Sequence, residues 1–232
     1  MSTTTLPTVD ATPTHDLPTA ERLRVNEIFY SLQGESTRAG LPCVLVRLTG
    51  CHLRCRWCDS EHAFYEGEWL SRAEVLAKVA AFGCPLVELT GGEPLLQPGA
   101  FPLLTDLCDA GYEVLVETSG AVDIAGVDPR VRRIVDVKCP GSGEVERNHW
   151  PNLDLLRPTD ELKLVIADEA DYVWARDLVL AQQLHRRCPV HFSPVADELE
   201  PAMLAEWILR DHLPVRLSLQ LHKQLWGGVR GT

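Results

Sequence analysis

Seven short apolar runs, separated mostly by stretches with helical spacing, constrain the fold of this 232-residue chain more than any other feature. Most runs are continuous rather than alternating, as in parallel strands that are buried on both faces. They are predicted as strands at 43–48, 86–89, 113–117, 134–137, 162–166, 190–192 and 216–219. Repeated strand–helix units predict an α/β fold with a parallel sheet and right-handed crossovers. The pattern leaves open whether the sheet closes into a barrel.

Four segments between these runs are predicted as helices. Residues 71–74, Ser-Arg-Ala-Glu, form a capping box that begins a helix extending to about Phe82. Residues 98–110 form a second helix, which Gly111 ends. Apolar residues at helical spacing predict two more helices over 168–187 and 201–213.

The N-terminal segment has a different composition. Residues 1–20 are rich in Thr and Pro, and we expect a disordered tail because few large apolar side chains are available to offset the entropy of ordering. Residues 21–232 are predicted as one domain. The tail has neither a basic start nor an apolar run, so a signal peptide is not expected. No stretch approaches membrane-spanning length, and we expect a cytoplasmic protein with reduced thiols.

The charge balance limits the partners. Acidic residues outnumber basic ones by 33 to 22, which gives a formal net charge of −11. Such a surface repels a phosphate backbone, so we expect no nucleic-acid partner, and without a membrane span we expect no membrane partner. A small-molecule substrate fits this composition better.

Three of the eight cysteines lie in one short loop directly after the first predicted strand. Cys51, Cys55 and Cys58 have the spacing C-x3-C-x2-C, and soft thiolates favour zinc or iron–sulfur over hard cations. A cubane held by three thiolates keeps one iron without a protein ligand, and an open metal position can activate a bound molecule. The alternative is a structural Cys3His zinc site in a non-enzymatic module, with His52 or His62 as the fourth ligand.

The cysteine loop, taken with residues 89–94 (Leu-Thr-Gly-Gly-Glu-Pro) after the next strand, resembles the radical S-adenosylmethionine superfamily. The two glycines let the backbone approach a ligand at the carboxyl edge of a sheet. The resemblance implies a partial (incomplete) parallel β/α barrel, with residues 21–232 as the catalytic domain. It also implies a 4Fe–4S cluster on the three cysteines and S-adenosylmethionine as cosubstrate. The radical arises on the cofactor, so no protein acid, base or nucleophile is expected.

Four further segments resemble the 7-carboxy-7-deazaguanine synthase family, namely 28–36, 46–51, 57–60 and 220–223. Leu-Gln-Gly-Glu, within the first segment, is the most specific part. The resemblance implies conversion of 6-carboxy-5,6,7,8-tetrahydropterin to 7-carboxy-7-deazaguanine, a lyase reaction that releases ammonia in queuosine and related 7-deazapurine biosynthesis. It further implies a homodimer and a reductant such as a flavodoxin. A glycyl-radical activating enzyme is the alternative that keeps the cluster, but such enzymes lack the Leu-Gln-Gly-Glu segment.

The same resemblance implies a substrate site. A pterin presents a 2-amino group beside a ring N–H, and these donors suit main-chain oxygens or a carboxylate. An Arg within an apolar strand is a buried-looking charge that needs a partner, and it could clamp the substrate carboxylate; the alternative is an ordinary ion pair. The predicted substrate contacts are Leu32, Gln33, Gly34, Glu35, Arg47 and Thr90.

Cofactor contacts are implied in the same way. Those to S-adenosylmethionine are expected from Trp57, Cys58, Asp59, Gly92, Asp136, Val137, Lys138, Phe192, Ser193, Pro194 and Val195. The segment 136–138 departs from the family's commoner Ser-Pro-Lys form. The family also places Mg²⁺ on the hydroxyl that follows Cys-Asp, usually a Thr. Ser60 stands there and keeps the oxygen ligand, but it lacks the methyl group that stiffens the Thr rotamer.

Overall fold

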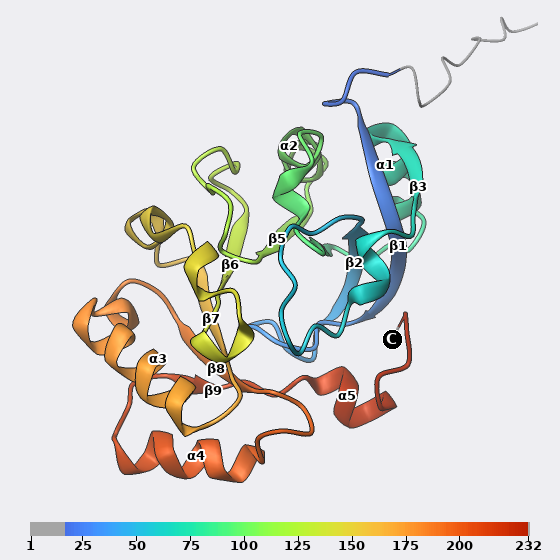
Figure 1. Ribbon diagram of the computed structural model, residues 1–232. Coiled ribbons are helices and arrows are strands. Elements are labelled where there is room, and N and C mark those ends of the chain that lie inside the picture. Colours follow the sequence, from blue (N-terminus) through green and yellow to red (C-terminus); the bar gives the residue numbers. More distant parts are fainter. Residues whose placement is uncertain (1–16, 232) are drawn as a thin grey trace, which may run out of the picture.

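The computed structural model describes residues 17–231 and contains one nine-stranded sheet in that part of the chain, in the order β3-β1-β2-β4-β5-β6-β7-β8-β9 (Figure 1). The strands are β1 (Arg22–Leu32), β2 (Pro42–Leu48), β3 (Glu68–Ser71), β4 (Leu86–Gly91), β5 (Glu113–Thr118), β6 (Arg132–Val137), β7 (Glu161–Ile166), β8 (Val190–Pro194) and β9 (Arg216–Leu217).

The predicted parallel sheet is confirmed. From β2 through β4 to β9, every adjacent pair of strands is parallel. The sheet curves but stays open, because β3 and β9 are its two edges and do not pair with each other. The helices that follow β3, β4, β7 and β8 lie on the outer side of this curve in Figure 1. The architecture is therefore the partial parallel barrel that the family resemblance implies.

Two antiparallel strands were not predicted. β1 pairs antiparallel with both β2 and β3, and its register shifts between Val25 and Glu27. Only Leu23 and Val25 of its side chains are buried, while the rest of the strand is partly exposed or exposed. A half-exposed strand with charged residues lacks the continuous apolar run by which the parallel strands are found.

The helices are α1 (Arg72–Ala80), α2 (Ala100–Asp109), α3 (Glu169–Ala181), α4 (Pro201–Arg210) and α5 (Leu221–Trp226). The predicted capping box is confirmed, since the Glu74 N–H donates to Ser71 Oγ (3.2 Å) and the Ser71 N–H donates to Glu74 Oε2 (2.7 Å). The helix predicted over 168–187 ends early because Gln183 adopts a left-handed φ of 50°. None of the helices in the described part is long and apolar enough to cross a membrane.

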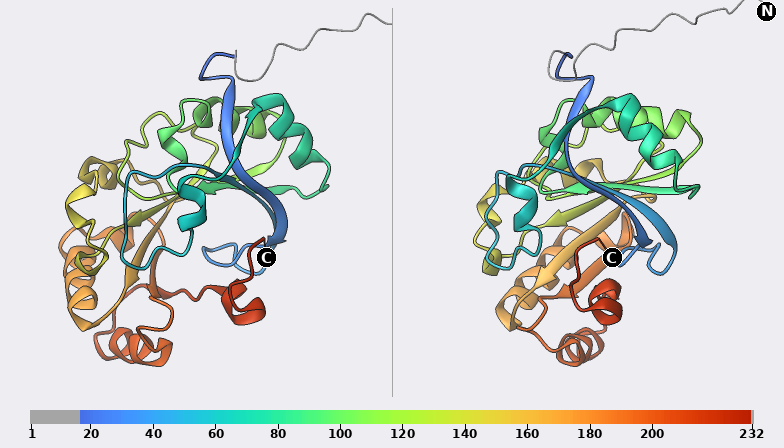
Figure 2. Two further views of the ribbon diagram at one scale, coloured as in Figure 1. Left: turned by 45° about the vertical axis from the view of Figure 1, so that its right-hand side comes forward. Right: turned by 90° about the vertical axis from the view of Figure 1, so that its right-hand side faces the viewer.

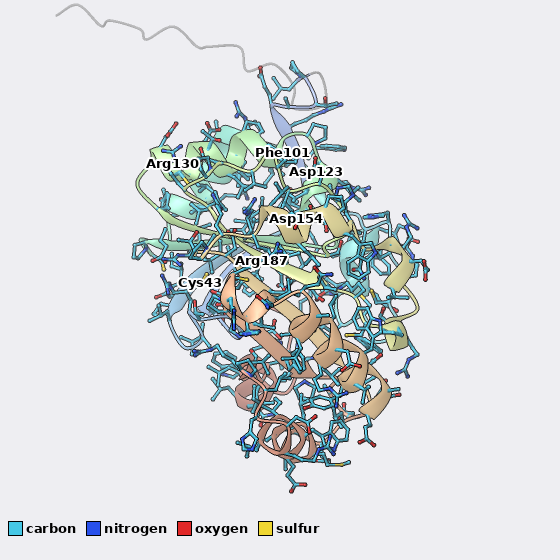
Figure 3. The ribbon with its side chains drawn as sticks, turned by 90° about the vertical axis from the view of Figure 1, so that its left-hand side faces the viewer. Cys43, Phe101, Asp123, Arg130, Asp154 and Arg187 are labelled. Atoms are coloured by element: carbon cyan, nitrogen blue, oxygen red, sulfur yellow. The ribbon has the colours of Figure 1, made fainter. Side chains whose placement is uncertain are left out.

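Two crossovers depart from the predicted strand–helix alternation. The β5–β6 connection contains no helix within the described chain, and the β6–β7 connection contains the short 3₁₀ turns η4 (Pro140–Ser142), η5 (Val145–Arg147) and η6 (Trp150–Leu155). Figure 3 labels Asp154 and Arg187, whose ion pair (3.0 Å) ties η6 to the segment after α3. Prolines and glycines along this connection disfavour a regular helix. The remaining short 3₁₀ turns are η2 (Glu61–Phe64), η3 (Pro94–Leu96) and η7 (Leu184–Arg186).

Most of the tail predicted over residues 1–20 lies outside the described residues, which begin at Leu17. The last part of it forms a turn that precedes β1, in which the Glu21 N–H donates to the Pro18 carbonyl (2.8 Å). The Arg72 N–H in turn donates to the Glu21 carbonyl (3.0 Å), so this turn is attached to the start of α1.

Candidate active site

A cavity of about 610 Å³ lies on the inner side of the curved sheet, toward the carboxyl ends of the parallel strands. The strands β1, β2 and β4 to β8 each contribute residues to its lining, and the loops after β1 and β2 and the C-terminal segment close it further. Ligands of open α/β sheets gather at this edge. All the predicted site residues line the cavity except Val137 and Phe192.

The cysteine loop is held in place by its main chain. The Gly50 N–H donates to the Ala63 carbonyl (2.8 Å), the Cys58 N–H to the Cys55 carbonyl (3.2 Å), and the Arg56 N–H to the Ser142 carbonyl (3.0 Å). These bonds connect the loop to η2 and to the turn after β6. The loop is therefore positioned by the fold itself, and the three predicted cysteines open into one cavity.

The thiols of this loop are partly buried. Burial raises the pKa of Cys55 to about 11 and also raises the pKa values of Cys51 and Cys58. Neighbouring thiolates add to the rise at Cys55, while the Lys138 ammonium acts against it. Thiols bind metal as thiolates, so loading this loop with metal would release protons. Three soft donors on one ordered loop fit an iron–sulfur cluster with one open corner.

The zinc alternative requires a different geometry. Between residues 17 and 231, no three His, Cys, Asp or Glu side chains are arranged to hold one metal ion. Each thiolate of a cubane binds a separate iron, so its ligands need not converge on one atom. His62, a proposed fourth zinc ligand, has its Nε2 atom 3.5 Å from Glu27 Oε1 on β1.

The glycine motif after β4 is packed directly against the cysteine loop. A Cβ atom on Gly92 would lie 2.4 Å from the Gly50 carbonyl oxygen and 2.7 Å from Cys51 Cβ, so only glycine fits there. Glu93 is fully buried. Its oxygens accept hydrogen bonds from the Leu95 N–H (2.9 Å), from the Ser119 N–H (2.7 Å) and from the Thr118 and Ser119 hydroxyls. The carboxyl of Glu93 thus holds the motif's loops together.

The loop after β1 brings acidic groups to the floor of the cavity. Glu35 pairs with Lys163 on β7, and Lys163 Nζ also lies 2.9 Å from Glu117 Oε1 on β5. Burial opposes the ionisation of Glu117, but Lys163 outweighs it and lowers the pKa of that carboxyl. The second oxygen of Glu35, Oε1, is buried without a partner in the described chain. An unpaired buried acceptor of this kind suits a donor group on a ligand.

The sequence left open whether Arg47 faces a ligand or forms an ordinary ion pair, and in the structure it is placed for both. Its Nε donates to Glu27 Oε1 (2.8 Å), which is the ordinary ion pair, and its guanidinium also lines the cavity. Its Nη1 donates to Ser60 Oγ (3.4 Å), and that hydroxyl donates to Asp59 Oδ1 (3.0 Å). Burial alone would raise the pKa of Glu27, but the hydrogen bonds and positive charges of Arg47 and Arg230 outweigh burial and lower it. Arg47 is therefore fixed beside Ser60.

The C-terminal segment covers the open side of the sheet. Figure 2 shows α5 (red) close to the blue N-terminal strands. Lys223 Nζ and Gln220 Nε2 lie 3.0 and 3.1 Å from Asp59 Oδ2, and these contacts hold the pKa of Asp59 well below its usual range despite burial. The Leu221 N–H donates to the Gly34 carbonyl (2.9 Å). A Cβ on Gly34 would lie 2.6 Å from His222 Nδ1, so glycine permits this close contact.

The residues expected to contact S-adenosylmethionine divide into two groups. Asp136 and Lys138 form a buried ion pair (2.9 Å) at the cavity wall, and Oδ1 of Asp136 is buried without a partner in the described chain. The side chains of Val137 and Phe192 instead lie in the hydrophobic core. Phe192 packs edge-on against Tyr172 of α3 (6.1 Å between centroids). For these two, only main-chain atoms are available to the cavity, because successive strand residues point to opposite faces.

Several cavity residues were missed by the sequence reasoning. Glu88, Glu117 and Lys163 are charged side chains within apolar strands, which is the signal that singled out Arg47. Applied to every strand, it would have found them. Gln220, His222, Lys223 and Arg230 carry no such signal, since their segment is short and polar; for the first three, the family resemblance of segment 220–223 was the available pointer.

Comparison with known proteins agrees with this site. The radical SAM superfamily model matches residues 45–140, which contain the cysteine loop and the glycine motif. The 7-carboxy-7-deazaguanine synthase of Chlorobaculum tepidum is 48% identical over 213 residues, covering 90% of this chain and 97% of the relative. That of Koribacter versatilis is 46% identical, covering 88% and 97%. The crystal structure of QueE from Escherichia coli has a TM-score of 0.68 at 25% identity, covering 87% of this chain and 95% of that one.

An open parallel barrel with three cysteines after its first parallel strand, and a glycine motif after the next, defines a radical S-adenosylmethionine enzyme. That class includes many reactions on related folds. The similarity to relatives over nearly their full length identifies the family within this class: the chain belongs to the 7-carboxy-7-deazaguanine synthase family. Membership of this family decides against both the zinc module and the glycyl-radical activating enzyme.

Proposed function

We propose that this chain converts 6-carboxy-5,6,7,8-tetrahydropterin to 7-carboxy-7-deazaguanine with release of ammonia, as a step of queuosine and related 7-deazapurine biosynthesis. The observation that carries the proposal is the cavity itself, in which Arg47 and Glu35 lie with the cysteine loop. A substrate with a carboxylate at one end and paired N–H donors at the other needs a cation and an acceptor in the same pocket.

Cys51, Cys55 and Cys58 would hold a 4Fe–4S cluster, which with S-adenosylmethionine would supply the one-electron chemistry that initiates the rearrangement. The protein's own residues would bind and orient. Arg47 would take the substrate carboxylate through the edge of its guanidinium that Glu27 leaves free. Glu35 would accept from the pterin N–H groups, as would the main chain of Leu32, Gln33 and Gly34, and Thr90 would contribute a hydroxyl.

Contacts to S-adenosylmethionine would come from the cavity wall. The unpartnered oxygen of Asp136 supports this role, since a buried acceptor favours a donor such as an ammonium or a ribose hydroxyl. The other contributors would be Trp57, Cys58, Asp59, Gly92, Lys138, Ser193, Pro194 and Val195. Val137 and Phe192 would contribute main-chain atoms alone.

A Mg²⁺ ion would bind at Ser60 together with the substrate. The chain provides one hydroxyl there and a neighbouring Asp59 oxygen, Oδ1, while Asp59 Oδ2 is occupied by Lys223 and Gln220. Mg²⁺ needs near-octahedral oxygen ligation, so substrate carboxylate and water would supply the remaining ligands. The nearby Arg47 guanidinium disfavours a cation until that carboxylate arrives.

The wider setting follows the family. We expect the enzyme to work in the cytoplasm as a homodimer, with electrons from a reductant such as a flavodoxin. The partly buried cysteine loop supports the need for a dedicated reductant, because its cluster would sit at the cavity rather than on an open surface.

The test is a direct assay. Anaerobically reconstituted protein is incubated with 6-carboxytetrahydropterin, S-adenosylmethionine, Mg²⁺ and dithionite, and product is measured by absorbance and mass spectrometry. We expect 7-carboxy-7-deazaguanine with an equal amount of ammonia. The Cys55→Ala protein is the negative control. Cleavage of S-adenosylmethionine without any deazapurine would contradict the proposed substrate while leaving the enzyme class intact.

A further inference from the structure

Glu88 is a buried carboxyl group that the proposed function does not use. It lies on β4, two residues before Thr90 and on the same face of the strand, with 2% of its surface exposed. It nevertheless lines the cavity. Gln33 Nε2 donates to its Oε2 atom (2.5 Å), and within residues 17–231 this is the only hydrogen bond that its side chain makes. Its other oxygen, Oε1, is left for the cavity.

The charges around Glu88 do not balance. Glu35 faces it from the loop after β1, Glu117 from β5, Lys163 from β7 and Cys43 (labelled in Figure 3) from β2. Lys163 is the one ammonium in this group, and it contacts Glu35 and Glu117 rather than Glu88. Three buried carboxyls around one cation cannot all carry a charge at low cost.

Burial raises the pKa of Glu35, but the Lys163 ammonium opposes that rise, so the proton belongs on Glu88, the carboxyl that lacks a cation. Burial, with the neighbouring Glu117 charge, raises the pKa of Glu88 to about 8, and the Gln33 hydrogen bond only partly opposes this. A neutral carboxylic acid has one O–H donor as well as acceptors. With Oε2 accepting from Gln33, the hydroxyl of the acid lies at Oε1.

We propose that Glu88 is a specificity-determining residue that binds the substrate as a neutral acid, donating a hydrogen bond from Oε1 to the carbonyl oxygen of the pterin lactam. Gln33 supports this arrangement, because its amide bonds Glu88 through Nε2 and the Glu35 N–H through Oε1 (2.6 Å). Glu35 then offers an acceptor and Glu88 a donor. A lactam presents the complementary pair, an N–H beside a C=O. This inference rests on the proposed function and deepens it.

Substrate affinity should follow the protonation of Glu88. The neutral form is present below pH 8 and is lost as the pH rises, so binding should weaken with increasing pH. At one pH unit above the pKa, about a tenth of the group is protonated. The Kd should therefore rise about tenfold between pH 7 and pH 9. The Glu88→Gln side chain keeps both roles at every pH, since its oxygen accepts from Gln33 and its amide donates to the substrate.

The experiment measures Kd for 6-carboxytetrahydropterin by anaerobic calorimetry, with reconstituted protein, S-adenosylmethionine and no reductant. We expect wild-type and the exposed control Glu146→Gln to lose about tenfold in affinity from pH 7 to pH 9, and Glu88→Gln to show no change. Thermal unfolding and iron content verify that each variant is folded and loaded. A wild-type Kd that does not change with pH, or a Glu88→Gln Kd that rises with pH as the wild-type Kd does, would overturn the inference.

A second measurement needs no variant. The 4-amino analogue of the substrate has an amino group where the lactam has a carbonyl. Its N–H donor would therefore face the O–H donor of Glu88, and no hydrogen bond could form between them. We expect it to bind wild-type protein at pH 7 at least about a hundredfold more weakly than the substrate. Equal binding of the two would refute the role of Glu88. If neither compound binds and no deazapurine forms, the proposed function fails instead.

Discussion

Replacing Glu93 by Gln tests whether the motif glutamate is a structural group. The carboxyl is fully buried and accepts from the Leu95 N–H, from the Ser119 N–H and from the hydroxyls of Thr118 and Ser119. All of these partners donate. A Gln side chain has nearly the same shape but substitutes an NH₂ donor for one acceptor oxygen, so it cannot satisfy them all.

The cost can be worked from these contacts. In its better orientation the amide oxygen replaces Oε2, which receives the Ser119 bonds and one from Thr118, and the NH₂ then faces the Leu95 N–H. A buried donor left unsatisfied costs about 1–3 kcal/mol. The retained bonds weaken as well, since bonds to a carboxylate are roughly twice as strong as neutral ones. We therefore expect a loss of about 3 kcal/mol in the free energy of unfolding.

The assay is thermal unfolding of the protein before cluster loading. For a domain of this size, 1 kcal/mol corresponds to about 2–4 °C, so Glu93→Gln should lower Tm by roughly 6–12 °C. Glu68→Gln, an exposed residue on β3, is the matched control and should stay within about 0.5 kcal/mol of the wild type. If Glu93→Gln melts with the wild type, the carboxyl does not hold the motif in the way described.

Three further predictions concern the cofactors and substrate. Cys55→Ala should lose the brown colour and the roughly four irons of the reconstituted protein, whereas Cys188→Ala, a change in the core, should retain both; equal iron in the two variants would contradict the cluster assignment. Arg47→Ala should weaken substrate binding in calorimetry by about 2 kcal/mol while cluster loading is unchanged, with the surface variant Arg130→Ala as control, and an unaltered Kd would remove Arg47 from the site. Ser60→Ala should reduce turnover and its Mg²⁺ dependence while Ser60→Thr retains both; turnover of the wild type that is equal in EDTA and in millimolar Mg²⁺ would exclude the metal.

The parallel part of the fold was predictable because strands that are buried on both faces have continuous apolar runs in the sequence. β1 and β3 were not predictable in this way, since each has a partly solvated face, and β3 is also an edge strand of the sheet. Glycine and proline account for the other differences. Strand–helix alternation was expected, with four helices predicted, but the crossover from β6 to β7 is rich in both residues and forms 3₁₀ turns.

The sequence brought candidate site residues together most directly where they are close along the chain. Cys51, Cys55 and Cys58 share one loop, so their spacing alone brings them together. The partners of Glu35 could not be found by spacing, because Lys163 is 128 residues away and meets it only through the curvature of the sheet. The prediction placed all of residues 192–195 in contact with S-adenosylmethionine. Successive side chains of a strand point to opposite faces, however, and the side chain of Phe192 lies in the core.

The anchoring of the loop after β1 has a consequence for the order of assembly. Thr37 donates to Glu161 at the start of β7, 124 residues along the chain, and Arg38 pairs with Glu113 at the start of β5 (2.7 Å). Contacts of such long sequence separation form late, because the entropy of closing the intervening chain must be met first. A nascent chain that has emerged only as far as β6 would carry its three cysteines but lack an ordered pterin pocket. The loop after β1, which contains Glu35, can therefore be anchored only after β7 has been synthesised.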